Sequence, residues 1–312
     1  MKTRFGPINI IPGENKSRFP SCTSLFLDDD VKVLIDPGAG YQRLNELRHK
    51  VSIDIVINTH YHFDHIAYNH LFEDARIIIN DKEAECFRNR KTIGALLGME
   101  EVYGNAWVED WLSRISKPDT LQSPFSPQNN HRWWISTSRV DGEYTWGDVM
   151  DFGKTRMYVL GAPGHSGGFS CMYFPEYGVI YVGDLDLTPF GPWYGGSDGD
   201  INKFISTCHE IEHIDAKFFI TGHEAGIVTK DEFQKGMMRF LDIIEHRDRK
   251  IITLLSQGVS LEELVDQGPI YGKKYHGDAW IYMWEFIMVK KHILRMIDQG
   301  LITKVDGRFI AA

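Results

Sequence analysis

The chain has 312 residues, of which 43% are hydrophobic and 25% are charged, and such proportions are ordinary for a globular enzyme. Its net charge of −9 disfavours a surface that follows the phosphate backbone of nucleic acid, because such surfaces carry a basic stripe. No stretch reaches the roughly 18 consecutive apolar residues of a membrane span, and the N-terminus lacks the apolar run of a signal peptide.

Short apolar segments rich in β-branched residues recur along the first two thirds of the chain. Segments of this kind that end at Gly, Pro or polar residues are typical of buried strands. We expect such strands at residues 8–11, 24–27, 31–35, 53–59, 157–160, 179–182 and 217–221. Shortly after five of these segments comes a side chain that can bind metal or support a ligand, namely Asp36, His60, His165, Asp184 or His223. Loops at strand ends can meet on one rim, where function usually lies.

The densest group of potential ligands is the hexapeptide at 60–65, His-Tyr-His-Phe-Asp-His. His60 and His62 are two residues apart and point the same way on an extended segment, whereas Asp64 and His65 reach a second ion only if the chain turns. Imidazole nitrogen and carboxylate oxygen both bind zinc and related ions. The chain offers enough ligands for two divalent ions, namely His60, His62, Asp64, His65, His165, Asp184 and His223.

This ordered set resembles the hallmark of the metallo-β-lactamase superfamily, which is His-x-His-x-Asp-His followed by a distant His, Asp and His. The resemblance covers roughly residues 5–230 and implies an α/β fold, an αββα sandwich with the metal ions at one edge. It implies a first site from His60, His62 and His165, a second from Asp64, His65 and His223, and a bridge through Asp184. Asp36 matches an early Asp of the superfamily that supports a ligand, although it could equally cap the turn before Pro37.

The residue at the bridging position, Asp184, also helps to distinguish subfamilies of the metallo-β-lactamase superfamily. Antibiotic-hydrolysing members of the zinc-dependent types generally lack an Asp at the bridging position, so the chain resembles the glyoxalase II and lactonase-like hydrolases. Flavin-linked di-iron reductases usually replace the second His with Glu, whereas His62 is present here. A mononuclear-iron dioxygenase shares much of the same ligand list and stays open as an alternative, as does a metallo-hydrolase acting on nucleic acid.

The resemblance implies a hydrolase in which a hydroxide held by two metal ions attacks a small ester, thioester or lactone. Paired metals lower the pKa of water toward about 7 and polarise a carbonyl. Two divalent ions are therefore expected, with zinc preferred and iron or manganese open, because imidazole and carboxylate suit all three. Asp64 is expected to accept a proton as well as bind metal, and Asp184 to be needed by both ions.

The segment after Asp184 is rich in Gly and Pro and predicts a shaped loop near the metals. We expect Asp186 to hydrogen-bond a ligating His and Tyr194 to donate its hydroxyl to a developing oxyanion. Trp193 is expected to stack on substrate, so that Trp193 and Tyr194 form the substrate pocket. Loop capping and aromatic packing are the alternatives for each of these side chains.

Residues from about 85 to 140 look inserted into a catalytic domain that spans 1–230. They hold four of the eight tryptophans, Trp107, Trp111, Trp133 and Trp134. This segment is expected either to cover the active site with an apolar wall or to form a dimer contact, since aromatic residues are enriched in both settings.

Residues 231–312 predict a helical, winged-helix-like appendage. Ser260 begins a helix with Glu263 at its third position, a long helix lies around 279–298, and Asp306-Gly307 predicts a hairpin. Packing or dimerisation is favoured over DNA binding, because the long helix carries mixed charges. Four scattered cysteines, with no close pair, predict reduced thiols. We expect a cytoplasmic homodimer that acts on a small molecule.

Overall fold

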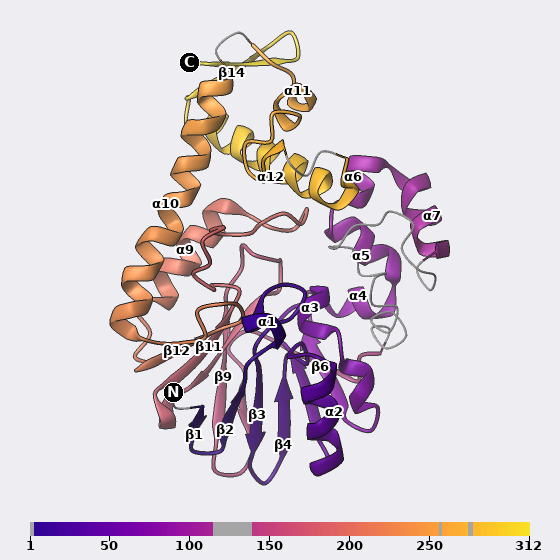
Figure 1. Ribbon diagram of the computed structural model, residues 1–312, viewed down its shortest axis with the longest axis vertical. Helices are drawn as coiled ribbons and strands as arrows, with labels where there is room; N and C mark the ends of the chain where they lie inside the picture. Colours follow the sequence, from indigo (N-terminus) through magenta and orange to yellow (C-terminus); the bar gives the residue numbers. More distant parts are fainter. Residues whose placement is uncertain (1–2, 115–138, 256–257, 274–276) are drawn as a thin grey trace.

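The computed structural model describes residues 3–114, 139–255, 258–273 and 277–312. Two β-sheets pack face to face in the lower part of Figure 1, and helices lie outside both sheets. The predicted α/β class and the αββα sandwich are therefore confirmed. In the described ranges, no helix combines the length and apolarity needed to cross a bilayer.

The first sheet has seven strands in the order of the sequence. These are β1 (Arg4–Phe5), β2 (Ile8–Ile11), β3 (Ser24–Asp28), β4 (Lys32–Ile35), β5 (Ile55–Asn58), β6 (Arg76–Asn80) and β7 (Gly142–Tyr144). Pairing is antiparallel from β1 to β4 and parallel from β4 to β7, with Ile35 opposite Ile57. The buried strands β4 to β6 consist largely of Ile, Val and Leu, whose branched side chains fit a sheet covered on both faces.

The second sheet has six strands in the order β13-β12-β11-β10-β9-β8. Their bounds are β8 (Val149–Asp151), β9 (Arg156–Gly161), β10 (Ser170–Phe174), β11 (Val179–Gly183), β12 (Phe218–Thr221) and β13 (Ile227–Thr229). β11 and β12 are parallel, and the other neighbours are antiparallel. All seven strand segments expected from the sequence are present, with ends that differ by at most two residues.

Three apolar cores hold the four layers together. Between the sheets, Ile35 and Ile57 pack with Val159 and Tyr181. Outside the first sheet lies α2 (Tyr41–Lys50), and outside the second lie α9 (Ile201–Ile211) and the first half of α10 (Lys230–Leu254). The short segments α1 (Glu14–Ser17), α3 (Phe63–Ile66), η1 (Asn69–Phe72) and η3 (Pro175–Tyr177) connect strands near the edges.

The segment predicted as an insert forms four short helices in its described part. These are α4 (Ala84–Arg88), α5 (Arg90–Leu96), α6 (Met99–Tyr103) and α7 (Asn105–Arg114). Trp111 is fully buried within the chain and packs edge-on against Trp280 at 6.0 Å between ring centroids, so it offers no surface to a substrate or a second copy. Trp133 and Trp134 lie outside the described residues.

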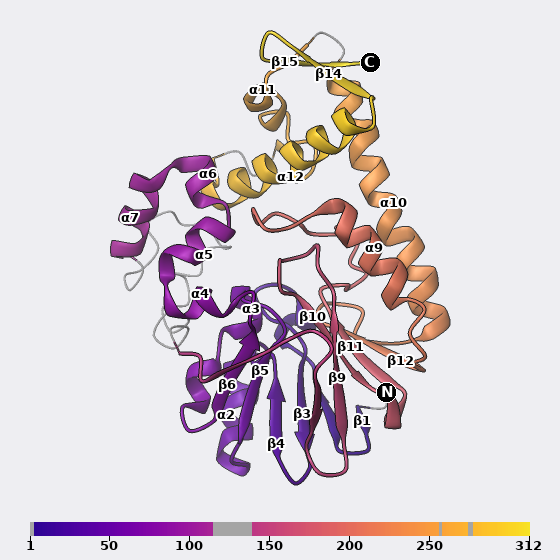
Figure 2. The same ribbon diagram turned by 180° about the vertical axis from the view of Figure 1, so that it is seen from behind.

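The C-terminal region stands above the sandwich in both views (Figures 1 and 2). It contains the second half of α10, α11 (Leu261–Val265), α12 (Ala279–Asp298) and the hairpin of β14 (Ile302–Val305) and β15 (Arg308–Ala311). The long helix and the Ser260 capping box appear as predicted, and the hairpin turns at Asp306-Gly307 with positive φ at both residues. Because α10 contributes to the sandwich and the appendage alike, the expected boundary near residue 230 falls at the start of a shared helix.

Candidate metal centre

Five strands are followed within four residues by a side chain that can bind metal or support a ligand. The strands β4, β5, β9, β11 and β12 lead to Asp36, His60, His165, Asp184 and His223. β4 runs parallel to β5, β11 runs parallel to β12, and β9 shares the direction of β11 because both are antiparallel to β10. Within each sheet these loops therefore leave from one edge, and the ligand side chains converge there.

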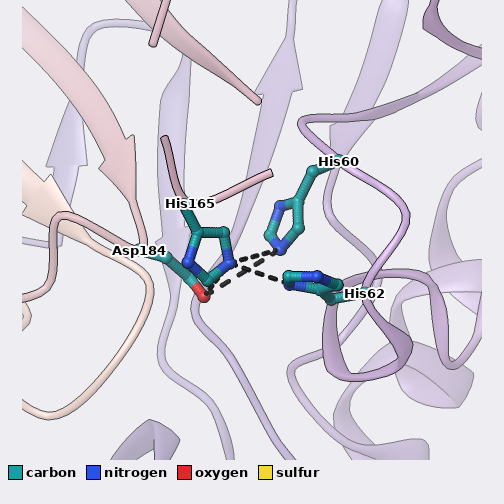
Figure 3. A group of neighbouring side chains, drawn as sticks. All are labelled: His60, His62, His165 and Asp184. Atoms are coloured by element: carbon teal, nitrogen blue, oxygen red, sulfur yellow. Dashed lines mark hydrogen bonds and ion pairs between the residues drawn. The ribbon is translucent and has the colours of Figure 1, made fainter. Parts of the chain in front are cut away.

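The first ligand group is formed by His60, His62, His165 and Asp184, which point toward one another from three chain segments (Figure 3). His165 Nε2 lies 2.8 Å from His62 Nδ1 and 3.3 Å from His60 Nε2. Asp184 Oδ2 lies 3.0 Å from the same His165 nitrogen. Three imidazoles and one carboxylate oxygen thus surround a common point.

The second ligand group consists of Asp64, His65 and His223. His223 Nε2 lies 3.1 Å from Asp64 Oδ2, and His65 Nε2 lies 2.9 Å from Asp184 Oδ1. The short helix α3 supplies the turn that brings Asp64 and His65 out of the extended His60–His62 segment. The two oxygens of Asp184 therefore face different ligand groups, Oδ2 the first and Oδ1 the second.

The tautomers of four imidazoles are set by hydrogen bonds on the nitrogen that faces away from the ligand groups. Each Nδ1 donates: His60 to Thr59 Oγ1 at 3.0 Å, His65 to Asp36 Oδ2 at 2.8 Å, His165 to the Trp193 carbonyl at 2.9 Å, and His223 to the Ser17 carbonyl at 2.7 Å. In a neutral ring such a partner leaves Nε2 unprotonated, and it orients the ring toward a cation. His62 differs because its Nδ1 faces the first group.

These groups fit divalent metal ions. Ligand atoms about 2.05 Å from a tetrahedral zinc ion lie about 3.3 Å apart, and the separations within the groups range from 2.8 to 3.9 Å. His65 Nε2 and Asp184 Oδ1 are buried and face each other at 2.9 Å, and His223 Nε2 lies 3.5 Å from the same oxygen. Ligand atoms gathered this closely and shielded from water suit a bound cation.

The imidazoles of the two ligand groups have different electrostatic surroundings. Burial lowers the pKa of His60 and His62 well below the usual imidazole value, and neighbouring imidazoles act in the same direction. Both rings are therefore neutral and free to donate a lone pair. Burial acts to lower the pKa of His65 and His223 as well, but nearby acidic groups outweigh it and raise both pKa values well above the usual value.

Two buried carboxylates hold the ligand loops in place. Asp36 accepts from Thr59 N at 2.7 Å, from Thr59 Oγ1 at 2.7 Å and from His65 Nδ1 at 2.8 Å, which supports the predicted role of Asp36. Glu83 accepts from Tyr61 N, between two ligands, and from the Gly168 amide, both at 2.8 Å. Its third donor, at 2.5 Å, is the hydroxyl of Ser166, next to His165.

The role of Glu83 was not predicted from the sequence, because its hydrogen-bond partners lie 22 to 85 residues away along the chain. Burial and the Asp198 carboxylate raise the pKa of Glu83 to about 8, against the effect of these donors. Its burial beside the strand β6, in a chain where acidic residues are mostly exposed, is visible only once the fold is known.

The ligand groups line a cavity of about 630 Å³. Its wall is largely apolar and comes from six parts of the chain: Phe19, Phe63, Leu97, Phe190, Trp193, Ile270, Tyr271 and Trp284. Trp193 lines the cavity as predicted and lies edge-on to His62, with ring centroids 5.0 Å apart. A cavity of this volume with a few convergent polar groups is typical of a small-molecule site.

Tyr194 has a different place from the one predicted. It is fully buried, its hydroxyl lies 2.7 Å from His292 Nε2 and accepts from Arg247 at 2.9 Å, and it does not line the cavity. The expectation that Tyr194 contacts substrate is therefore corrected. The tyrosine that does line the cavity is Tyr271, whose hydroxyl accepts from Trp193 Nε1 at 2.9 Å.

Asp186 lines the cavity, but its carboxylate accepts from the Thr188 amide at 3.1 Å. The Nδ1 atoms of His60, His65, His165 and His223 are all bonded elsewhere, so the predicted bond from Asp186 to a ligating His is replaced by a turn within its own loop. Burial raises the pKa of Asp186 to about 7.

Comparison with known proteins agrees with this geometry. The family model described as the metallo-β-lactamase superfamily matches residues 18–85 and 93–223. An acyl-coenzyme A thioesterase, MBLAC2 of Bos taurus, is 26% identical over 203 residues, which are 57% of this chain and 62% of that protein. An uncharacterized protein of Aquifex aeolicus is 23% identical over 153 residues, 49% of this chain and 58% of that protein. The match thus spans about three fifths of each curated relative.

Two solved structures share the fold over nearly the whole chain. The metallo-β-lactamase family protein TTHA1429 from Thermus thermophilus has a TM-score of 0.72 at 16% identity, covering 98% of this chain and 99% of that one. A β-lactamase domain protein from Burkholderia ambifaria has a TM-score of 0.67 at 14% identity, covering 100% and 93%. With the family model matching most of the chain and both ligand groups in place, the protein belongs to the metallo-β-lactamase superfamily and has the fold of its hydrolases.

Proposed function

We propose that the chain is a hydrolase for small thioesters or esters that requires two divalent metal ions. The observation that carries the proposal is the placement of Asp184, whose two oxygens face different ligand groups on the wall of an apolar cavity. One carboxylate shared in this way supports two ions close enough to act on a single substrate.

The residues divide into two holding groups. His60, His62 and His165 would hold one ion, Asp64, His65 and His223 the other, and Asp184 would contact both. Bound ions of this kind lower the pKa of water toward about 7 and polarise a carbonyl oxygen. Asp64 lines the cavity, so its carboxylate is also placed to accept a proton beside the substrate.

The acyl substrate class has two supports. The cavity wall beyond the ligands is apolar and aromatic, which suits an acyl group better than a charged polymer. The relative MBLAC2 of Bos taurus is an acyl-coenzyme A thioesterase, and its similarity covers 62% of its own length. We place thioesters before oxygen esters and lactones for this reason, and zinc before iron or manganese from the ligand types alone.

The test combines metal analysis with substrate assays. Protein loaded with excess zinc, iron or manganese should reach two equivalents and hydrolyse acyl thioesters, and Asp184→Asn should lose metal and at least about a thousandfold in kcat/KM. Asp242→Asn, an exposed carboxylate on α10, is the matched control and should keep both. A plateau at one equivalent of iron with oxygen uptake would replace the proposal by the dioxygenase alternative.

A further inference from the structure

The cavity wall has a buried part and an exposed part. Phe63, Leu97 and Trp284 are 7%, 3% and 8% exposed, and we call these three residues the floor. Phe19 and Phe190 are 38% and 36% exposed and form the rim, and Phe19 meets Trp284 edge-on with ring centroids 6.4 Å apart. The ligands His62 and Asp64 flank Phe63 in the sequence, so the floor begins directly beside the metal centre.

The floor is built from three separate parts of the fold. Phe63 comes from the ligand motif, Leu97 follows α5 of the insert, and Trp284 lies on α12 of the appendage. Insert and appendage meet one residue beyond Leu97, where a Cβ added to Gly98 would lie 1.9 Å from Ile287 Cδ1. Gly98 is the N-cap of α6, so the start of α6 and the helix α12 are in direct contact next to Leu97.

The wall contributed by the appendage is also fixed. The buried Glu285 accepts from the amides of Ile270 at 2.8 Å and Tyr271 at 2.6 Å, so the chain at 270–271 is tied to α12. Trp193 Nε1 donates to the Tyr271 hydroxyl at 2.9 Å, which ties the same segment to the loop above the metals. Because these hydrogen bonds already hold the wall in place, a ligand that binds against its rings loses little free energy to ordering side chains or loops.

The charged side chains that line the cavity are mostly acidic. Among the described residues that line it, the Lys or Arg side chain is Arg18, which is exposed and paired with Glu224 at 3.3 Å. The other charged groups in the lining are the metal-binding carboxylates, Asp186 and Glu224. The floor residues themselves carry no charge, so an apolar acyl group would bury its surface against them.

We propose that Phe63, Leu97 and Trp284 form an acyl subsite that takes an apolar acyl group and limits its length. This inference rests on the proposed thioester or ester hydrolysis. The carbonyl lies at the ligands, the acyl chain lies against the floor, and the leaving group passes between Phe19 and Phe190. Water supplies OH to the acyl carbon and H to the departing sulfur or oxygen, so a carboxylic acid and a thiol or alcohol are released.

Chain-length profiles test the subsite. Across straight-chain acyl thioesters of one leaving group, kcat/KM should rise about fourfold per methylene until the chain meets the floor, and then fall. Leu97→Ala should move the optimum to chains longer by about three methylenes, the carbons that the substitution removes. Leu294→Ala is the control, because it truncates an exposed apolar side chain on α12, the helix that carries Trp284. It should leave the optimal chain length unchanged.

A second measurement needs neither metal nor turnover. Straight-chain 1-alkanols, added to metal-free protein, should quench or shift the fluorescence of Trp193 and Trp284 with an affinity that rises with chain length. Trp284→Leu is the independent variant if Leu97→Ala does not fold, and it too should favour longer chains.

The outcomes separate the two proposals. If no acyl substrate is hydrolysed but alkanols bind with the expected length limit, the proposed reaction fails and the subsite stands. If thioesters are hydrolysed with a profile that is flat, or identical in wild type, Leu97→Ala and Trp284→Leu, the subsite is overturned and the proposed reaction stands.

Discussion

Asp36 and Glu83 support the ligands in different ways. Asp36 bonds His65 directly and reaches His60 through the Thr59 hydroxyl, so it serves both ligand groups. Glu83 bonds the backbone of Tyr61 and Gly168, which flank ligands of the first group only. Residues that orient metal ligands typically change affinity by about 10- to 100-fold when they are replaced.

We expect Glu83→Gln to weaken one of two metal equivalents by at least about tenfold and leave the other unchanged. The amide keeps one acceptor oxygen but turns an N–H toward the Tyr61 amide, which displaces the His60–His62 segment. Asp36→Asn should weaken both equivalents. Competition with a chromophoric chelator measures the two affinities, and Glu85→Gln, exposed on the same α4, is the control. Equal weakening of both equivalents by Glu83→Gln would contradict this division of roles.

The metal ligands could be predicted from the sequence because four of them lie in one hexapeptide and the rest follow recognisable strands. Glu83 could not, because no local pattern connects it to Tyr61 or Gly168. The prediction for Tyr194 was wrong for a related reason. The Gly- and Pro-rich context predicted the loop correctly but did not show which aromatic ring faces the cavity. In the fold the ring packs on Phe204, and the hydroxyl meets His292, which is 98 residues away along the chain.

Among the elements, the loop from Asp184 to Gly196 depends on the two long helices behind it. Arg247 of α10 donates to the carbonyls of Phe190 and Pro192, each at 2.6 Å. Lys291 of α12 donates to the Tyr194 carbonyl at 3.0 Å and also to the Gly196 carbonyl. The loop carries Trp193, whose carbonyl accepts from His165, so the helices act on the metal centre through it.

Lys291 gives this contact a pH dependence. Burial lowers the pKa of Lys291 from 10.5 to about 8. Between these values the unfolded chain binds more protons than the folded one, so this group destabilises the fold below pH 8 and does so less as the pH rises toward 10.5. The free energy of unfolding of wild type minus that of Lys291→Met should therefore increase from about pH 8 to about pH 10 in urea titrations. A constant or falling difference would show that the ammonium is well solvated.

Helices and strands whose apolar residues recur at a regular spacing could be predicted closely. The strands were visible as runs of β-branched residues, and α12 from apolar residues at helical spacing after Asp278, which caps it by accepting from the Trp280 and Ile281 amides. The insert could not be resolved in this way, because α4 to α7 are short and their stability comes from packing on α12.

In the whole molecule, the aromatic insert joins the catalytic sandwich to the appendage through one core. Trp111 lies at its centre with Trp280, while Trp107 is partly buried and stacks on Tyr103 at 4.7 Å. We expect Trp111→Ala to lower the free energy of unfolding by about 3–5 kcal/mol and Trp107→Ala by less, measured by urea denaturation. A loss below about 1 kcal/mol for Trp111→Ala would contradict the central place of Trp111 in this core.

The homodimer and the cytoplasmic location stay predictions.

The contact between Gly98 and Ile287 has a consequence for exchanging parts between relatives. Gly98 has φ +87°, a backbone conformation that other residues rarely adopt, and a Cβ there would displace the end of the Ile287 side chain on α12. A chimera that takes an appendage with a larger or smaller residue at the position of Ile287 would have to readjust this contact. Insert and appendage are therefore one transplantable unit, although all six strands of the second sheet lie between them in the sequence.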